Sequence, residues 1–253
     1  MTNGESLISV FIDFENLALG AKDLHSGDFK VDLILKRLLE KGRIVYKRAY
    51  CDWSQYRSVV RAFHGQGIEL IDIPGTKMSG KNSADIHMVV DALDLCYAKE
   101  HIDVFALLSG DSDFSPLVSK LKENDKRVIG CGVKSSTSDL LIAGCDEFIY
   151  YDDLVRTART RKPVKRGAKQ AGDKQQEALD QLLDIVRSLK GDYDPLWGSL
   201  VKQTLRRVHP GFNEGYLGYR SFAELLKDGE HRGLLRLEKD EGRGNYKVFL
   251  PEE

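Results

Sequence analysis

Two short stretches, SVFIDFEN (residues 9–16) and FALLSGDSDF (residues 105–114), place acidic side chains directly after runs of apolar, β-prone residues. Asp13 ends the first run, and Asp111 and Asp113 follow the second. In an open parallel sheet the carboxyl ends of the strands share one edge, and ligand sites are built at that edge. Carboxylates gathered there repel one another and are costly to desolvate unless a cation holds them. The two stretches therefore predict a divalent-metal site in a cleft.

Around these stretches, strand and helix patterns alternate through the first part of the chain. Apolar, β-rich runs predict strands at residues 7–13, 43–50, 67–73, 103–108, 127–133 and 147–151. Apolar residues at helical spacing predict helices over 31–40, 55–63, from 84, over 115–123 and over 138–143. Strands that alternate with helices at this spacing are typical of an α/β fold, with a central parallel sheet covered by helices on both faces.

The composition changes after this part of the chain. The total formal charge is −1, but residues 1–155 carry a net charge of −6 and residues 156–253 a net charge of +5. The stretch RTARTRKPVKRGAK has seven basic residues and no acid, so we expect an exposed linker over residues 156–173. Residues 174–253 show three amphipathic helical patterns and then a hairpin signal, an order typical of a small winged-helix domain.

The composition also bounds the compartment. The four cysteines have no C-x-x-C spacing and lie in or near apolar segments, which is typical of buried thiols in a reducing compartment rather than of zinc or disulfide sites. No stretch approaches the roughly 18 apolar residues of a membrane span, and the N-terminus has no basic signal region. We therefore expect a cytoplasmic protein that does not act in a membrane.

A further acid, Asp85, lies in KNSADIHMVVDAL (residues 81–93) at the start of a predicted helix. Asp91 lies off the apolar stripe of that helix, so spacing alone makes it a solvated acid or one that supports the site indirectly. The predicted apolar stripe consists of Ile86, Val89, Val90, Leu93 and Tyr97.

Each candidate residue also has a purely structural interpretation. Asp85 in a first turn would stabilise the helix dipole, and Asp113 could be the N-cap of the next helix. Asn16 and Ser109 could orient water or a phosphate group at the site. Lys81 could hold a phosphate or be merely exposed.

Carboxylate oxygens are the ligands of hard cations, so the pattern indicates Mg²⁺ or Mn²⁺ rather than zinc. Such ions activate water and neutralise charge when a phosphodiester is cleaved. The chain has no G-x-G-x-x-G after its first strand, no Walker motif and no G-x-S-x-G motif. Spacing therefore points to a metal site but leaves the reaction open.

The motifs FIDFEN, KNSADIHMVVDAL and SGDSDFSPLVSKLKENDKRVIGCGVKSSTSDLL resemble the NYN domain, of the LabA-like branch of the PIN-like ribonuclease superfamily. The resemblance covers roughly residues 6–155. It implies a Rossmann-like PIN fold with a metal-binding acidic pocket that cuts RNA. It also implies a second helix acid at Asp91 and the strand-following asparagine at Asn16. The acids that it places in the pocket are Asp13, Asp85, Asp111 and Asp113.

Residues from about 175 to 250 resemble the LOTUS domain, also called OST-HTH, a winged-helix module linked to RNA binding. The segments that carry this resemblance are WGSLVKQTLRRVHPGF and FNEGYLGYRSFAELLKDGE. The order of the two domains is similar to that of two-domain bacterial proteins. On this basis the expected RNA contacts are Lys202, Arg206, Arg207, Tyr216 and Tyr219.

Together these observations predict a metal-dependent ribonuclease with a C-terminal RNA-binding module. The alternative is a catalytically weak or inactive regulator that binds RNA. An interaction scaffold, whose winged helix binds a protein partner, is a third hypothesis. A metal-dependent phosphatase or DNA nuclease using the same acids is a fourth.

Overall fold

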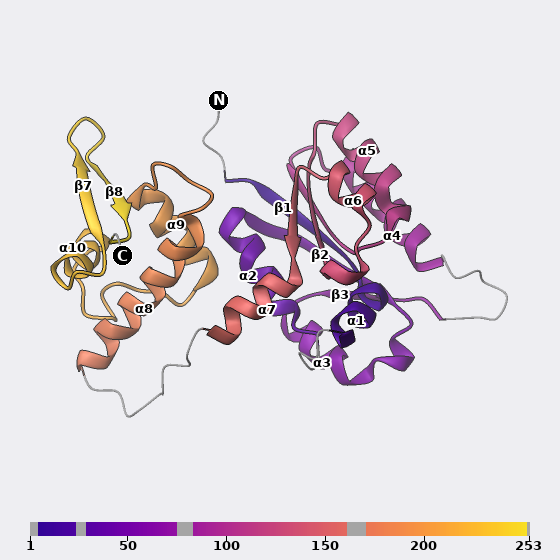
Figure 1. Ribbon diagram of the computed structural model, residues 1–253, viewed down its shortest axis with the longest axis horizontal. Helices are drawn as coiled ribbons and strands as arrows, with labels where there is room; N and C mark the ends of the chain where they lie inside the picture. Colours follow the sequence, from indigo (N-terminus) through magenta and orange to yellow (C-terminus); the bar gives the residue numbers. More distant parts are fainter. Residues whose placement is uncertain (1–4, 24–28, 75–82, 161–170, 252–253) are drawn as a thin grey trace. The chain divides into compact units, whose positions relative to one another are not determined.

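The computed structural model describes residues 5–23, 29–74, 83–160 and 171–251 (Figure 1). The chain divides into two compact units, formed mainly by the residues up to 162 and by those from 163 onward.

Six parallel strands form the sheet of the first unit, in the order β3-β2-β1-β4-β5-β6. The α/β fold class predicted from the sequence is therefore confirmed. The strand order reverses direction between β1 and β4, which makes their carboxyl ends the topological switch point where ligands bind in such sheets. The strands are β1 (Leu7–Asp13), β2 (Arg43–Cys51), β3 (Glu69–Asp72), β4 (Val104–Leu108), β5 (Arg127–Gly132) and β6 (Glu147–Tyr150).

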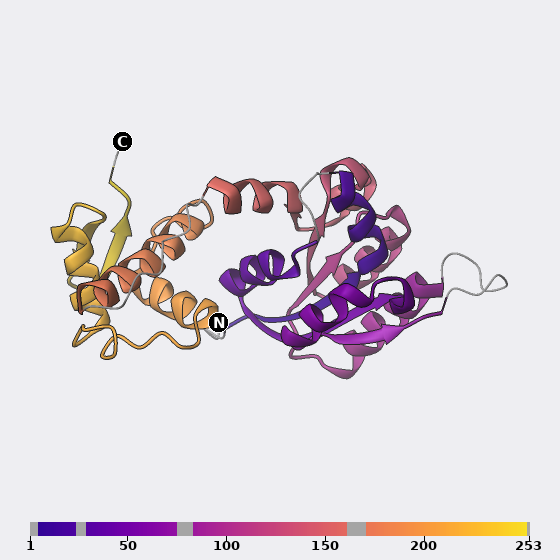
Figure 2. The same cartoon turned by 90° about the horizontal axis from the view of Figure 1, so that it is seen from below.

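Helices cover both faces of this sheet (Figure 1; Figure 2). One face packs against α1 (Phe14–Asp23), α2 (Val31–Lys41), α3 (Arg57–Gly65) and α7 (Tyr151–Thr160). The other face packs against α4 (Ser83–Ala98), α5 (Ser115–Glu123) and α6 (Asp139–Gly144). Side chains alternate along β1, since Val10 and Ile12 belong to the first core cluster and Phe11 to the second. Short 3-10 turns precede three of the helices: η1 (Trp53–Gln55), η2 (Ser112–Phe114) and η3 (Lys134–Ser136).

Two helices were not expected from the sequence. Helix α1 follows β1 without a break, so the residues after Asp13 are helical rather than part of a loop. Helix α7 occupies residues that were predicted to begin the linker. Its Leu154 and Val155 pack against the core of the first unit, and its first turn carries two acids, which stabilise the start of a helix. Residues 156–159 of the predicted linker are exposed as expected, but they are helical, because α7 continues through them. Residues 161–170 lie outside the described part of the chain, and residues 171–173 belong to helix α8 (Ala171–Leu189).

Only part of the predicted apolar stripe of α4 faces the core, where Val89 and Leu93 pack as partly buried residues. The fully buried side chains of the helix are Met88, Ala92 and Cys96. Ile86 and Val90 are exposed. Because α4 is apolar on more than one side, spacing alone could not tell which side packs against the sheet.

The second unit contains three helices and an antiparallel pair of strands, as the sequence predicted. The helices are α8 (Ala171–Leu189), α9 (Gly198–Val208) and α10 (Phe222–His231), and the hairpin joins β7 (Arg236–Asp240) to β8 (Asn245–Phe249). Aliphatic residues of all three helices form a core of their own with Leu235 and Val248 of the hairpin.

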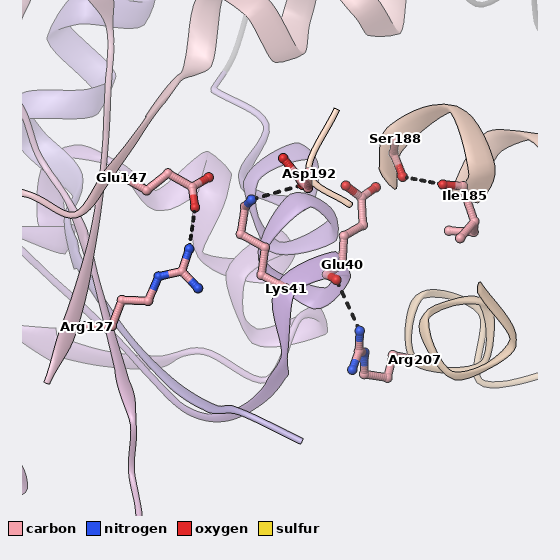
Figure 3. Close-up of polar contacts among 8 residues, drawn as sticks. All are labelled: Glu40, Lys41, Arg127, Glu147, Ile185, Ser188, Asp192 and Arg207. Carbon is pink, nitrogen blue, oxygen red and sulfur yellow. Dashed lines mark hydrogen bonds and ion pairs between the residues drawn. The ribbon is translucent and has the colours of Figure 1, made fainter. Parts of the chain in front are cut away.

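Polar contacts fix the geometry within each unit (Figure 3). In the first unit Arg127 donates a 2.9 Å hydrogen bond to Glu147, which ties β5 to β6 at their amino ends. In the second unit the Ser188 hydroxyl donates a 2.9 Å hydrogen bond to the Ile185 carbonyl within α8. Within the first unit, the Arg127–Glu147 contact lies at the opposite ends of the strands from Asp13 and Asp111.

All four cysteines are free thiols, and three of them are buried, as expected for small core residues. Cys145 is only partly buried. Among the described residues, no helix combines the length and the hydropathy that a membrane span requires.

Candidate active site

The site is organised around Asp13, the last residue of β1, at the switch point of the sheet. Its side chain is only 8% exposed. The Ser109 hydroxyl, just after β4, donates a 2.8 Å hydrogen bond to Oδ2 of Asp13. The backbone N–H of Asn16 donates to Oδ1 at 3.3 Å. Asp13 is therefore a buried carboxylate held by the residue after β4 and by the first turn of α1.

Asn16 links the same two strand ends through its side chain. Its Oδ1 accepts a 2.9 Å hydrogen bond from the N–H of Gly110. Gly110 packs closely against the next loop, because a Cβ built on it would lie 2.4 Å from the carbonyl oxygen of Ser136. The amide oxygen of Asn16 is thus used to hold the loop after β4, whereas the sequence suggested that it orients water or phosphate.

Asp111 and Asp113 follow in the turn after β4. The N–H of Asp111 donates to the Ser109 hydroxyl at 3.1 Å, and Oδ1 of Asp111 accepts from the N–H of Asp113 at 2.9 Å. Asp111 therefore caps η2, whereas Asp113 is exposed. The alternative that Asp113 caps the next helix is wrong, because α5 begins at Ser115 and its N-cap position is Phe114.

The acids influence one another electrostatically. The pKa of Asp13 is raised to about 7, mainly because the carboxyl group is buried; the nearby carboxylates of Asp85 and Asp111 contribute to the rise, and the hydrogen bonds from Ser109 and Asn16 oppose it. Burial also raises the pKa of Asp85, with added repulsion from Asp111, Asp113 and Glu15. The tertiary structure thus brings all four predicted acids together at one edge of the sheet.

Glu15 is a member of this acidic cluster that sequence reasoning missed. It is exposed in the first turn of α1 and contributes to the raised pKa of Asp85. Its position two residues after Asp13 was the available signal. Without the prediction of α1, however, the direction of its side chain could not be inferred.

The chemistry of the donors fits a divalent cation. All of the clustered side-chain donors are carboxylate oxygens, and a cation would offset both the burial of the Asp13 charge and the smaller repulsion from Asp85 and Asp111. Within the described parts of the chain, however, no three or more His, Cys, Asp or Glu residues form a group that could hold an ion. Metal binding would therefore require carboxylates of the cluster to move closer together.

Asp91, one and a half turns further along α4, lies apart from this cluster. Its Oδ2 accepts hydrogen bonds from Arg48 Nη1 at 2.8 Å and from the Tyr50 hydroxyl at 2.7 Å. Tyr50 is the register partner of Asp13 in the neighbouring strand. Asp91 thus fastens the helix that carries Asp85 to the strand beside Asp13. Lys81 lies outside the described residues.

In the second unit, two basic residues expected to contact RNA share an acidic partner. Lys202 and Arg206 lie one turn apart on α9, and both form ion pairs with Glu214, at 3.2 and 3.1 Å. Arg207 points differently, and its Nη2 donates to the Thr204 hydroxyl at 2.9 Å.

The two tyrosines of this unit have opposite environments. Tyr216 is 62% exposed, and the Lys174 ammonium lies 4.1 Å from the centre of its ring. Tyr219 is only 3% exposed, and its hydroxyl donates a 2.6 Å hydrogen bond to Asp228. The prediction that Tyr219 contacts RNA is therefore wrong, because its ring is part of the core.

Comparison with known proteins places this site in a family. The model of the NYN domain matches residues 7–152, which include every acid of the cluster. The chain belongs to the NYN domain family. NYN domains are part of the PIN-like nuclease superfamily, which suggests ribonuclease activity with RNA as the substrate. Nucleases of that superfamily generally use divalent metals.

Two further proteins are similar to this chain. Over 140 residues, which are 54% of this chain, the chain is 32% identical to the uncharacterized protein MJ0482 of Methanocaldococcus jannaschii. The match takes in 52% of that protein, so the chain spans about half the length of the curated relative it matches. A crystal structure of a protein of unknown function, VPA0982 from Vibrio parahaemolyticus, superimposes with a TM-score of 0.54 at 24% identity, covering 61% of this chain and 98% of that one. The second likeness concerns the fold alone.

Proposed function

We propose that the NYN unit is a metal-dependent ribonuclease that hydrolyses RNA phosphodiester bonds. The observation that carries this proposal is the buried Asp13 carboxylate at the switch point of the sheet, whose pKa is raised to about 7 mainly by burial and in smaller part by the nearby carboxylates of Asp85 and Asp111. A cluster of this kind is unfavourable without a counter-charge, and the family suggests RNA as the substrate.

The residues have distinct roles in this proposal. Asp13, Asp85 and Asp111 hold Mg²⁺ or Mn²⁺, and Asp113 supports them from the rim. The bound ion supplies an activated water and stabilises the negative charge that develops on the phosphate. Ser109 orients the Asp13 carboxylate through its 2.8 Å hydrogen bond.

For the second unit we propose a winged-helix, LOTUS-like module that captures RNA. Its three helices followed by a hairpin support this assignment. Exposed Arg206 and Tyr216 are its strongest candidates for RNA contacts, with 55% and 62% exposure. Lys202 and Arg206 would each contribute after exchanging Glu214 for a phosphate. Basic residues of this kind add affinity that falls as salt rises.

A second candidate function is a regulator that binds RNA with little or no cleavage. One observation favours it: the described acids do not form a group that could hold an ion as they stand. In this case the acidic cluster would be present without cleaving RNA, and the function of the protein would be RNA binding.

Cleavage of end-labelled single-stranded and structured RNAs in Mn²⁺, Mg²⁺ or EDTA distinguishes the two candidates. The protein would be assayed beside Asp13→Asn and Asp111→Asn, with Glu100→Gln as a matched control at an exposed acid. Metal-dependent cutting that both site variants lose and the control keeps supports the nuclease. Cutting that survives both substitutions contradicts the assigned site. RNA binding without cutting by any form supports the regulator.

A further inference from the structure

Helix α4 has an apolar face that the described part of the chain leaves exposed. Ile86, Val90 and Tyr97 are 62%, 58% and 60% exposed. Their spacing of four and seven residues places them on one side of a helix, in a line parallel to its axis. The residues that α4 buries against the sheet, such as Met88 and Ala92, lie on the other side.

This exposed stripe differs from the scattered apolar residues that every protein surface carries. Single exposed apolar side chains are ordinary, but a row of them along one helix marks an interaction site. A helix that is apolar on opposite sides is typical of one buried on both. The stripe therefore indicates that a further surface covers α4 in the working form of the protein.

We propose that the partner is a second copy of this chain, with α4 packed antiparallel on α4 of the partner subunit about a two-fold axis. Such an interface is self-complementary, because the two-fold axis brings the same surface patch of both subunits together. If residue i of one subunit contacts residue j of the other, residue j of the first also contacts residue i of the second. With the axis between Val90 and Asp91, the Val90 side chains of the two subunits lie next to each other, and Ile86 of one subunit lies within two residues of the level of Tyr97 of the other. The apolar stripe then forms the dry centre of the contact.

The charges beside the stripe are arranged for this pairing. His87 and Asp94 are both exposed and are seven residues apart, so they lie on the same flank of α4. In an antiparallel pair, His87 of each subunit comes beside Asp94 of the partner subunit, and the contact is made twice. A polar rim with matched donors and acceptors around an apolar centre is the usual composition of a protein interface.

The pairing leaves both acidic clusters accessible. Asp85 lies about 100° around the helix from Ile86, on the side that faces Asp13 and Asp111. Asp91 points toward Arg48 and Tyr50. Dimer formation therefore uses a part of α4 that the proposed nuclease site does not need, and the two proposals can be tested separately.

Sedimentation of the full chain over a wide range of protein concentration tests the dimer. We expect a concentration-dependent dimer for the wild type and a monomer for Val90→Glu, which buries a charge at the centre of the contact. Leu19→Glu, at an apolar residue of α1 that is 53% exposed, is the matched control and should dimerise like the wild type. Thermal unfolding of each variant shows whether it is folded. A wild type that stays monomeric, or a dimer that Val90→Glu leaves intact, overturns the proposal.

A charge exchange tests the antiparallel arrangement. His87→Glu and Asp94→Lys should each weaken self-association by about tenfold, which corresponds to about 1.4 kcal/mol. The double variant restores an opposite-charge pair across the interface and should recover most of the affinity. This pairing of the helices is contradicted if the double variant loses as much association free energy as the two single variants lose together.

Discussion

The hydroxyl of Ser109 donates a 2.8 Å hydrogen bond to Oδ2 of Asp13, joining the ends of two adjacent strands that are 96 residues apart in sequence. The same hydroxyl accepts a hydrogen bond from the N–H of Asp111. One serine thus connects the buried acid to the loop that carries the other acids. These hydrogen bonds hold the turn after β4 in a fixed position beside the end of β1.

Ser109→Ala should raise the pKa of Asp13 above its present value of about 7, because the Ser109 hydrogen bond lowers that pKa. In the nuclease proposal, metal-dependent cleavage would then require a more alkaline pH, and the folded state would lose about 1 kcal/mol. A pH–rate profile in Mn²⁺ measures the shift. Ser119→Ala, at an exposed serine of α5, is the control and should leave the profile unchanged. An identical profile for both variants would contradict the assigned role of Ser109.

Asp13→Asn should stabilise the protein in EDTA, because it removes a buried charge. The pKa of Asp13 rises from 3.8 to about 7 on folding, so the cost of its charge grows as the pH increases between these values and is complete above about pH 7. The gain in stability is expected to approach about 4 kcal/mol at alkaline pH and to vanish near pH 4. Urea unfolding at several pH values measures this gain.

Mn²⁺ should reverse the order of stability, so that the wild type becomes more stable than Asp13→Asn. If Asp13 is a ligand, Mn²⁺ stabilises the wild type more than Asp13→Asn, because binding to the folded state alone adds stability. Glu100→Gln should respond to pH and to Mn²⁺ like the wild type. Equal stabilisation of wild type and Asp13→Asn by Mn²⁺ would contradict the proposed ligand set.

Gly110→Ala should lose about 1–3 kcal/mol of stability, because the added methyl group meets backbone that cannot move aside. The new Cβ would lie 2.4 Å from the Ser136 carbonyl oxygen and 2.9 Å from the Thr137 Cα. RNA cleavage should fall as the turn carrying Asp111 shifts. Gly65→Ala is a matched control, since no atom lies within 4 Å of its added Cβ, and it should unfold at or above the wild-type temperature.

Asp91→Ala should reduce stability by about 2 kcal/mol or more. In the wild type Arg48 and the Tyr50 hydroxyl both donate to Asp91, and the substitution removes this shared acceptor. Thermal unfolding measures the loss, with Glu100→Ala as the control on an exposed acid. If Asp91 acts by fastening α4, then Asp91→Asn, which keeps an acceptor oxygen, should recover part of both stability and cleavage. A normal melting temperature with no cleavage would instead place Asp91 in direct contact with the reaction.

The two tyrosines of the second unit should separate stability from RNA binding. Tyr219→Phe removes a buried hydroxyl that hydrogen-bonds Asp228, so it should lower the melting temperature without changing RNA affinity. Tyr216→Ala removes an exposed ring and should weaken RNA binding with little effect on unfolding. Fluorescence anisotropy with a labelled RNA, measured beside thermal unfolding, gives both quantities. Unchanged affinity for Tyr216→Ala would exclude that ring from the RNA contacts.

Much of the first unit was predictable because its signals are local. Six strands were expected and six are found, since a buried parallel strand must be a short, nearly continuous apolar run. The gathering of Asp13 and Asp111 was also predictable, because parallel strands that end in acids deliver those acids to a common edge. The order of strands that brings β1 beside β4 came only with the tertiary structure.

By itself, then, the sequence determined the parallel α/β sheet and the edge at which its acids meet, because both follow from where apolar runs begin and end. Tertiary structure decided which of several apolar faces is buried and what each polar group contacts. It buried Met88 of α4 rather than Ile86, and placed the ring of Tyr219 in a core. It also turned Asp91 toward Arg48. These outcomes depend on which surfaces meet across the fold, a property of packing that residue spacing along one helix does not contain.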